Sequence, residues 1–126
     1  MLHSLLAVAG GGAVGAVARY LVYVATTSVL GLEAPFATLA VNVIGSLFMG
    51  FWVEAMALAW TVSKEARLFF LVGILGSFTT FSAFSLDFAT LYERGRFVLC
   101  VLYATASVAV SIGALFAGLL LARKIF

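Results

Sequence analysis

The segment GSFTTFSAFS, residues Gly76–Ser85, has no charge but carries several hydroxyl groups within a very apolar sequence. Serine and threonine hydroxyls can bond to the local backbone instead of continuing a helix, and glycine has poor helix propensity. We therefore expect a helix to break around Gly76–Thr80. At a broken membrane helix, freed carbonyls bind cations, and the N-terminus of the following half-helix favours anions. The segment thus predicts an ion-binding site.

Two phenylalanines, Phe81 and Phe84, follow the expected break. They lie three residues apart, so both rings can face the same way on a helix. Because an aromatic ring has a positive edge, rings presented edge-on could contact an anion. The alternative is that both rings only fill an apolar core, and the neighbouring hydroxyls favour the anion contact.

Two stripes of uncharged polar residues extend this candidate site. The first consists of Thr38, Asn42 and Ser46, and the second of Tyr103, Ser107 and Ser111. Residues spaced i, i+4 and i+8 share one face of a helix, so each stripe presents its polar groups together. The alternative is ordinary hydrogen bonding between membrane helices, which contributes about 0.6 kcal/mol per bond on average.

Arg19 and Asp87 are charges placed deep within apolar segments. A charge at the bilayer centre costs about 2.5–3.5 kcal/mol on insertion scales, so neither side chain should face lipid. The two could pair with each other or with backbone carbonyls and so fix helix packing. Alternatively, they could attract an anion or support the broken helix.

Membrane helices must position these side chains, because 65% of the 126 residues are hydrophobic and only 10% are charged. About 20 mostly apolar residues are needed to cross a bilayer. Four stretches qualify, with short charged breaks between them: residues 2–32, 35–60, 66–91 and 97–122. We therefore expect an all-α, multi-pass membrane protein with one domain, residues 1–126, surrounded by the lipid bilayer.

The composition argues against several other classes of protein. The net charge of +2 is too small and scattered to indicate nucleic-acid binding. The only histidine is His3, and there is no carboxylate pair at metal spacing, thiol pair or phosphate loop, so we expect no enzyme. The single cysteine, Cys100, cannot form a disulfide within the chain.

The charges at the ends of the four spans favour one orientation only weakly. With both termini inside, four basic residues lie inside and two outside: Lys64, Arg67, Arg123 and Lys124 against Arg94 and Arg96. Orientation follows the Lys and Arg bias, so this small bias permits insertion both ways. The alternative is an ordinary protein with its termini inside.

Small residues predict close packing between helices. Gly11 and Gly15 form a GxxxG pair, and Ser46 and Gly50 have the same spacing. Such pairs let helix backbones approach each other in lipid, although they do not identify the partner helix. Four helices are also few for enclosing a water-lined path, so we expect any pore to lie between subunits.

Three segments together resemble the Fluc family of fluoride channels, also called CrcB proteins. They are GGAVGAVARY at Gly11–Tyr20, ATLAVNVIGS at Ala37–Ser46 and GSFTTFSAFSLD at Gly76–Asp87. The resemblance covers essentially the whole chain. The departures are small: Ser77 stands where a second glycine is common, Ala83 where threonine is common, and Asp87 where glutamate is common.

The resemblance implies an antiparallel, dual-topology homodimer in the bacterial inner membrane, with two narrow pores at the subunit interface for passive fluoride export. The residues that match the family's fluoride path are Asn42, Phe81, Phe84, Ser107 and Ser111, with Tyr103 and Thr38 as supports. A structural sodium ion (Na+) at the dimer centre would be held by the backbone carbonyls of Gly76 and Thr79. Arg19 matches an arginine of the family's first helix.

Two other functions are compatible with four short membrane helices. One is a small multidrug transporter, also a dual-topology dimer, and the other is an assembly subunit that transports nothing. Transporters of the first kind resemble one another in a glutamate on the first helix that binds cationic substrates. The first span here offers Arg19 and no carboxylate, which argues against a cation exporter.

Overall fold

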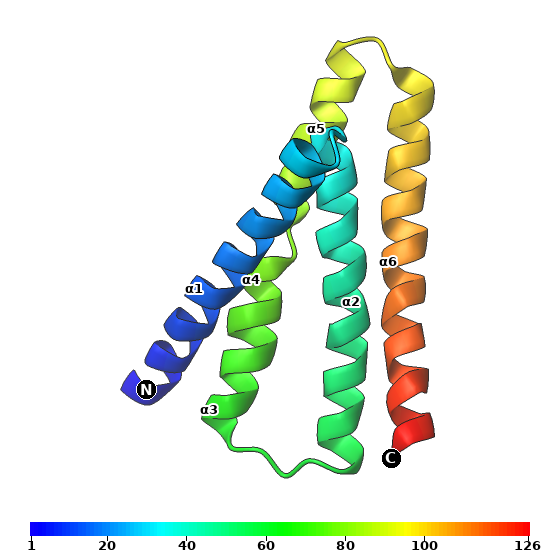
Figure 1. Cartoon of the computed structure of the whole chain (residues 1–126). Coiled ribbons are helices and arrows are strands. Elements are labelled where there is room, and N and C mark those ends of the chain that lie inside the picture. The colour runs from blue at the N-terminus through cyan, green and yellow to red at the C-terminus, as the bar shows by residue number, and fades with distance from the viewer.

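The computed structural model describes residues 1–126, and all of its regular elements are helices. Four of its helical stretches are long and apolar enough to cross a membrane: Leu2–Val29, Ala34–Leu58, Lys64–Glu93 and Phe97–Ile125. The prediction of an all-α chain with four spans is therefore confirmed, and the boundaries differ from the predicted ones by a few residues. Both termini lie at the same end of the bundle (Figure 1).

The first span is shorter than predicted. Helix α1 (Leu2–Val24) passes into a π-helical turn, η1 (Ala25–Val29), and helix α2 (Ala34–Leu58) follows after a short loop. Gly31 in that loop has φ 68°, a conformation that glycine adopts most readily. The first span therefore ends before Gly31, and Pro35 lies in the first turn of α2, where its fixed φ is compatible with the helix.

The third span consists of four helical pieces. They are α3 (Lys64–Arg67), η2 (Leu68–Leu75), α4 (Gly76–Phe78) and α5 (Phe81–Glu93). Between α4 and α5, Thr79 (φ −80°, ψ 156°) and Thr80 (φ −153°, ψ 120°) are extended. We call these two residues the extended pair. Gly76 is itself helical, so the irregular backbone begins later than the expected Gly76.

Helix α6 (Phe97–Ile125) packs against α2 along most of its length (Figure 1). A Cβ atom added at Gly50 would lie 2.0 Å from the Leu115 carbonyl oxygen, and one at Gly118 would lie 2.1 Å from that of Leu47. The two backbones therefore touch where both helices have glycine. This close approach places the polar face of α6 beside that of α2.

The GxxxG pair of α1 contacts the third span. A Cβ atom at Gly11 would lie 2.3 Å from the Phe69 carbonyl oxygen, and one at Gly15 would lie 2.1 Å from that of Ile74. Both partner residues belong to η2. The predicted close packing at Gly11 and Gly15 is thus confirmed, and its partner is the first half of the third span.

Candidate functional site

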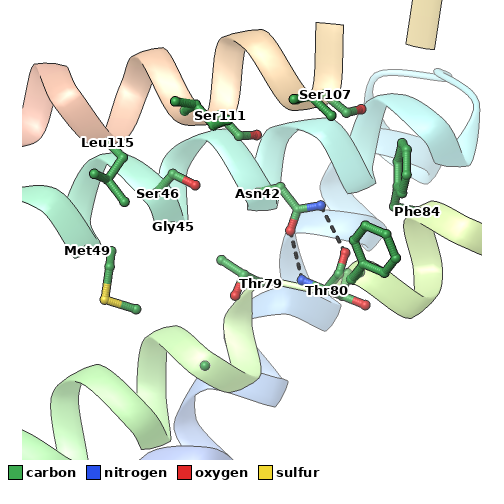
Figure 2. A pocket seen from close by; sticks show the side chains of 14 residues that line it. Asn42, Gly45, Ser46, Met49, Thr79, Thr80, Phe84, Ser107, Ser111 and Leu115 are labelled. Atoms are coloured by element: carbon green, nitrogen blue, oxygen red, sulfur yellow. Dashed lines mark hydrogen bonds between the residues drawn. The ribbon is translucent and has the colours of Figure 1, made fainter. Parts of the chain in front are cut away.

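A groove of about 560 Å³ lies between α2, α6 and the residues around the extended pair (Figure 2). Seven residues predicted to contact an ion line it: Asn42, Gly76, Thr79, Phe81, Phe84, Ser107 and Ser111. Its lining contains no charged side chain. The fold therefore brings residues of three separate spans to one uncharged surface.

Ser107 and Ser111 supply hydroxyl groups that are buried without any hydrogen-bond partner. The two residues lie one turn apart on α6 and both line the groove. A buried hydroxyl without a partner costs about 1–3 kcal/mol, and native proteins keep few of them. The pair therefore marks a position where two donors are available to an ion or a water molecule.

Phe81 and Phe84 both line the groove, as their spacing predicted, with ring centroids 5.4 Å apart and planes inclined by 46°. Phe81 is 76% exposed in the protomer, so its ring fills no core there. The ring of Phe84 packs against that of Tyr103, with centroids 5.2 Å apart. Tyr103 therefore connects the groove to a polar cluster next to it.

Thr38 and Tyr103 do not line the groove but form this polar cluster with Asp87 and Tyr23. The Thr38 hydroxyl donates to Asp87 Oδ2 at 2.5 Å, and the Tyr103 hydroxyl donates to the same oxygen at 3.0 Å. The Tyr23 hydroxyl contacts Thr38 Oγ1. Because Thr38 has one hydroxyl proton and directs it to Asp87, Tyr23 is the donor in that contact.

Arg19 lies apart from Asp87, and the two form no ion pair. The ion pairs of the structure join Arg96 to Glu33 and Arg123 to Glu54, near the ends of the bundle. Arg19 instead lines a second cavity, which it shares with Tyr23, Thr80 and Ser82. The ion pair between Arg19 and Asp87, one of the contacts expected from the sequence, is therefore absent. Asp87 instead accepts hydrogen bonds from two hydroxyl groups.

Asn42 contacts the extended pair with both ends of its side-chain amide (Figure 2). Its Nδ2 donates to the Thr80 carbonyl at 2.9 Å, and its Oδ1 accepts from the Thr80 backbone N–H at 2.8 Å. A side-chain amide has two N–H groups, so one remains for a ligand in the groove. Asn42 therefore both holds the backbone of α5's first turn and lines the groove.

The carbonyls of Gly76 and Thr79 lack the donors that a continuous helix would give them. The Thr80 N–H, four residues after Gly76, bonds to Asn42 instead. The Ala83 N–H, four residues after Thr79, bonds to Thr80 Oγ1 instead, at 3.1 Å. Unwound backbone carbonyls of this kind coordinate sodium in membrane proteins. The two predicted sodium ligands thus fit a cation, and they do so without a cluster of acidic, His or Cys side chains, of which the structure has none.

Two residues of this region, Tyr23 and Gly45, were not predicted from the sequence to belong to the site. Tyr23 follows Arg19 by four residues on α1, and that spacing on one helix face was the available signal. A Cβ atom at Gly45 would lie 2.2 Å from Thr79 Cγ2, so glycine is needed for α2 to approach the extended pair. Gly45 stands in the ATLAVNVIGS segment, but nothing in the sequence shows which residue it faces.

The chain was compared with known proteins. Residues 6–119 match the family described as "CrcB-like protein, Camphor Resistance (CrcB)". The Chelativorans sp. protein named "Fluoride-specific ion channel FluC" is 53% identical over 124 residues, 98% of this chain and 99% of the relative. The Agrobacterium fabrum protein of that name is 51% identical over 119 residues, 94% of this chain and 95% of the relative. That of Caulobacter vibrioides is 47% identical over 126 residues, 99% of both chains.

Proposed function

Since the chain belongs to the CrcB family, we propose that it is a fluoride-specific ion channel and not an enzyme. The observation that carries the proposal is the groove, which is lined by the unpartnered hydroxyls of Ser107 and Ser111 together with the rings of Phe81 and Phe84. Its relatives are named as fluoride channels, and the groove has donors that suit a small anion.

The chemistry of fluoride explains why such a groove would be uncharged. Fluoride is small and strongly hydrated, so a pore must replace its water with hydrogen-bond donors and still release the ion. Serine hydroxyls, the free N–H of Asn42 and the positive edges of aromatic rings donate without a full positive charge. The absence of a carboxylate from the groove lining also argues against a multidrug transporter that binds cations there.

The working unit in this proposal is an antiparallel, dual-topology homodimer with two pores at its interface. A single protomer leaves its groove open, since Phe81 is 76% exposed while it lines the groove. A second copy of the chain would close the groove and turn it into a narrow path. The weak bias in Lys and Arg between the two ends of the bundle is compatible with insertion in both orientations.

The extended pair has a separate role in this proposal, as the broken part of the third span. The carbonyls of Gly76 and Thr79 would hold a structural sodium ion at the centre of the dimer, where the ion would stabilise the irregular backbone. The ion would supply a fixed positive charge there, and the chain's own donors would conduct the anion.

A passive fluoride channel would protect a bacterial cell in acidic surroundings. Hydrogen fluoride crosses membranes as a neutral molecule and releases fluoride in the neutral cytoplasm, where the anion is trapped. A multi-pass channel in the inner membrane would let that fluoride leave down its gradient. The four spans of this chain are compatible with such a location.

The proposal is tested with purified protein in liposomes loaded with fluoride. We expect rapid fluoride efflux when the membrane potential is clamped with a potassium ionophore, and little chloride efflux under the same conditions. Proton-coupled uptake of organic cations without fluoride efflux would instead indicate a multidrug transporter. Liposomes that release neither would support an assembly subunit.

A further inference from the structure

We propose that Asn42 is a positioning residue for the cation site: it frees the carbonyl of Gly76 and turns that of Thr79 toward the cation. The inference rests on the sodium site of the proposed function and assigns the residue that prepares its ligands. Asn42 therefore has a second role besides lining the groove.

The first step is a competition for one backbone proton. In a continuous helix the Thr80 N–H would bond to the Gly76 carbonyl, four residues earlier. Asn42 Oδ1 accepts a hydrogen bond from that N–H at 2.8 Å, so the Gly76 carbonyl is available to another partner. A side chain on α2 thus opens a ligand position on the third span.

The second step follows from the planarity of the peptide bond. The Thr79 carbonyl and the Thr80 N–H belong to one trans peptide, so they point in opposite directions. Because the Thr80 N–H points at Asn42 on α2, the Thr79 carbonyl oxygen points away from Asn42. The same hydrogen bond therefore sets the direction of the second sodium ligand.

Two further contacts keep the Thr79 carbonyl free and the peptide in place. The Thr80 hydroxyl accepts the Ala83 N–H, which would otherwise return to Thr79. The Nδ2 of Asn42 donates to the Thr80 carbonyl at 2.9 Å, so the two residues are joined by a pair of hydrogen bonds. Thr80 is only 7% exposed, and water has little access to compete for these contacts.

The test compares variants that keep or remove each acceptor. Asn42→Asp keeps an acceptor oxygen for the Thr80 N–H but loses the N–H that donates to the Thr80 carbonyl, whereas Asn42→Leu has the same branching at Cγ and loses both contacts. In the same way, Thr80→Ser keeps the hydroxyl that accepts from Ala83, and Thr80→Val removes it. Each purified protein is exchanged into choline chloride, its sodium content is measured by elemental analysis, and sodium chloride is titrated while thermal unfolding is followed.

We expect Asn42→Leu and Thr80→Val to bind sodium about 10–100-fold more weakly, the usual effect of losing a contact that orients a metal ligand. Asn42→Asp should bind sodium more tightly than Asn42→Leu, because it keeps the acceptor for the Thr80 N–H, and Thr80→Ser should bind sodium as well as the wild type. Asn42→Asp should nevertheless stop fluoride efflux, because an ionised carboxylate in the groove accepts hydrogen bonds and repels an anion. That combination separates the positioning role from the role in the fluoride path.

Wild-type sodium binding by both Asn42→Leu and Thr80→Val would overturn the inference, as would sodium binding by Asn42→Asp that is no tighter than by Asn42→Leu. If Asn42→Leu fails to fold, Asn42→Ala, which also lacks an acceptor for the Thr80 N–H, takes its place, and the Thr80→Val and Thr80→Ser pair tests the contact with Ala83 separately. A wild-type protein that holds no sodium would overturn the sodium site and this inference together. If the wild type and the variants bind sodium in the expected order but the wild type conducts no fluoride, the inference is supported and the proposed channel function is overturned.

Discussion

At the scale of single residues, the groove separates hydrogen-bond donors from charges. Ser107 and Ser111 have buried hydroxyls without partners, whereas the carboxylate of Asp87 lies outside the groove and binds two hydroxyls. Arg19 lines another cavity. A conducting site must bind its ion firmly enough to admit it and weakly enough to release it. Neutral donors meet both needs better than a fixed positive charge would.

The two phenylalanines provide a test of whether ring edges contact fluoride. Phe81→Leu and Phe84→Leu keep most of the apolar volume, and such changes usually cost under about 1.5 kcal/mol of stability. If the polarised ring edge contacts the ion, fluoride efflux should fall far more than this small loss of stability would explain. Phe→Met at either position should retain more efflux than leucine does, because methionine is polarisable and adaptable.

Fluoride efflux and thermal unfolding are measured on the same preparations of all four phenylalanine variants. Near-normal efflux in both leucine variants, from intact dimers, would show that the rings only pack. Phe81 makes this test sharper, because its ring is exposed in the protomer and the stability of one subunit depends little on it.

Asp87 provides a test of the polar cluster. Asp87→Leu would leave the Tyr103 hydroxyl without an acceptor and Thr38 with only the longer contact to the Ala34 carbonyl, at 3.3 Å, so the free energy of unfolding should fall by about 1–3 kcal/mol. Asp87→Asn keeps one acceptor oxygen and should cost less. Denaturation followed by circular dichroism would check this order, and equal stability of the two variants would contradict the assignment of Asp87 as the shared acceptor.

At the scale of elements, α2 is shaped to receive the extended pair of the third span. Asn42 bonds to the Thr80 backbone, and Gly45, nearly one turn later, leaves room for the Thr79 side chain. Helix α6 then approaches α2 closely enough, through Gly50 and Gly118, to bring its serines to the same groove. The site therefore depends on two close helix contacts more than on any one residue.

Gly45→Ala should disturb the site by pushing the extended pair away from α2. The added Cβ would lie 2.2 Å from Thr79 Cγ2 and 3.2 Å from Phe78 Cδ1. Overpacking of this kind typically costs about 1–3 kcal/mol, and we expect both thermal stability and fluoride efflux to fall. Adding Thr79→Ser removes the methyl group that clashes, and it should restore part of both.

Gly113→Ala is the matched control for Gly45→Ala. A Cβ atom at Gly113 meets nothing within 4 Å in the protomer, and alanine favours a helix over glycine by about 1 kcal/mol. The thermal stability of the Gly113→Ala variant should therefore equal or slightly exceed that of the wild type. If Gly45→Ala behaves like Gly113→Ala, or if Thr79→Ser gives no recovery, the close approach of α2 to Thr79 is not what the site needs.

The sequence predicts the elements better than their contacts. Hydropathy identifies four spans because each must be long and apolar enough to cross a bilayer. The spacing of Gly11 and Gly15 predicts a close contact, but only the fold shows that η2 is its partner. The bond from Asn42 to Thr80 joins residues 38 apart and depends on how two helices are rotated against each other. The π-helical backbone of η2 has no proline or polar residue that would reveal it.

At the scale of the whole molecule, both termini and the α2–α3 loop lie at one end of the bundle (Figure 1). That end carries Lys64, Arg67, Arg123 and Lys124, and the other end carries Arg94 and Arg96. Because this bias is small, we expect a cysteine added after Phe126, in a Cys100→Ala background, to be labelled from both sides of the membrane. Labelling from one side only would contradict the antiparallel dimer.

The charges also allow the orientation to be fixed and the dimer to be tested directly. Arg94→Gln with Arg96→Gln leaves all four remaining span-end basic residues at one end, so this variant should insert with its termini inside. The contact from Arg96 to Glu33 is partly exposed, and its loss should change stability little. Lys64→Gln, Arg67→Gln, Arg123→Gln and Lys124→Gln together leave Arg94 and Arg96 as the remaining span-end basic residues, so this second variant should insert in the opposite orientation. If the two subunits must be antiparallel, each variant alone should lose fluoride efflux, and co-expression of both should restore it. Full efflux from either variant alone, with labelling from one side, would show that parallel copies or single subunits conduct.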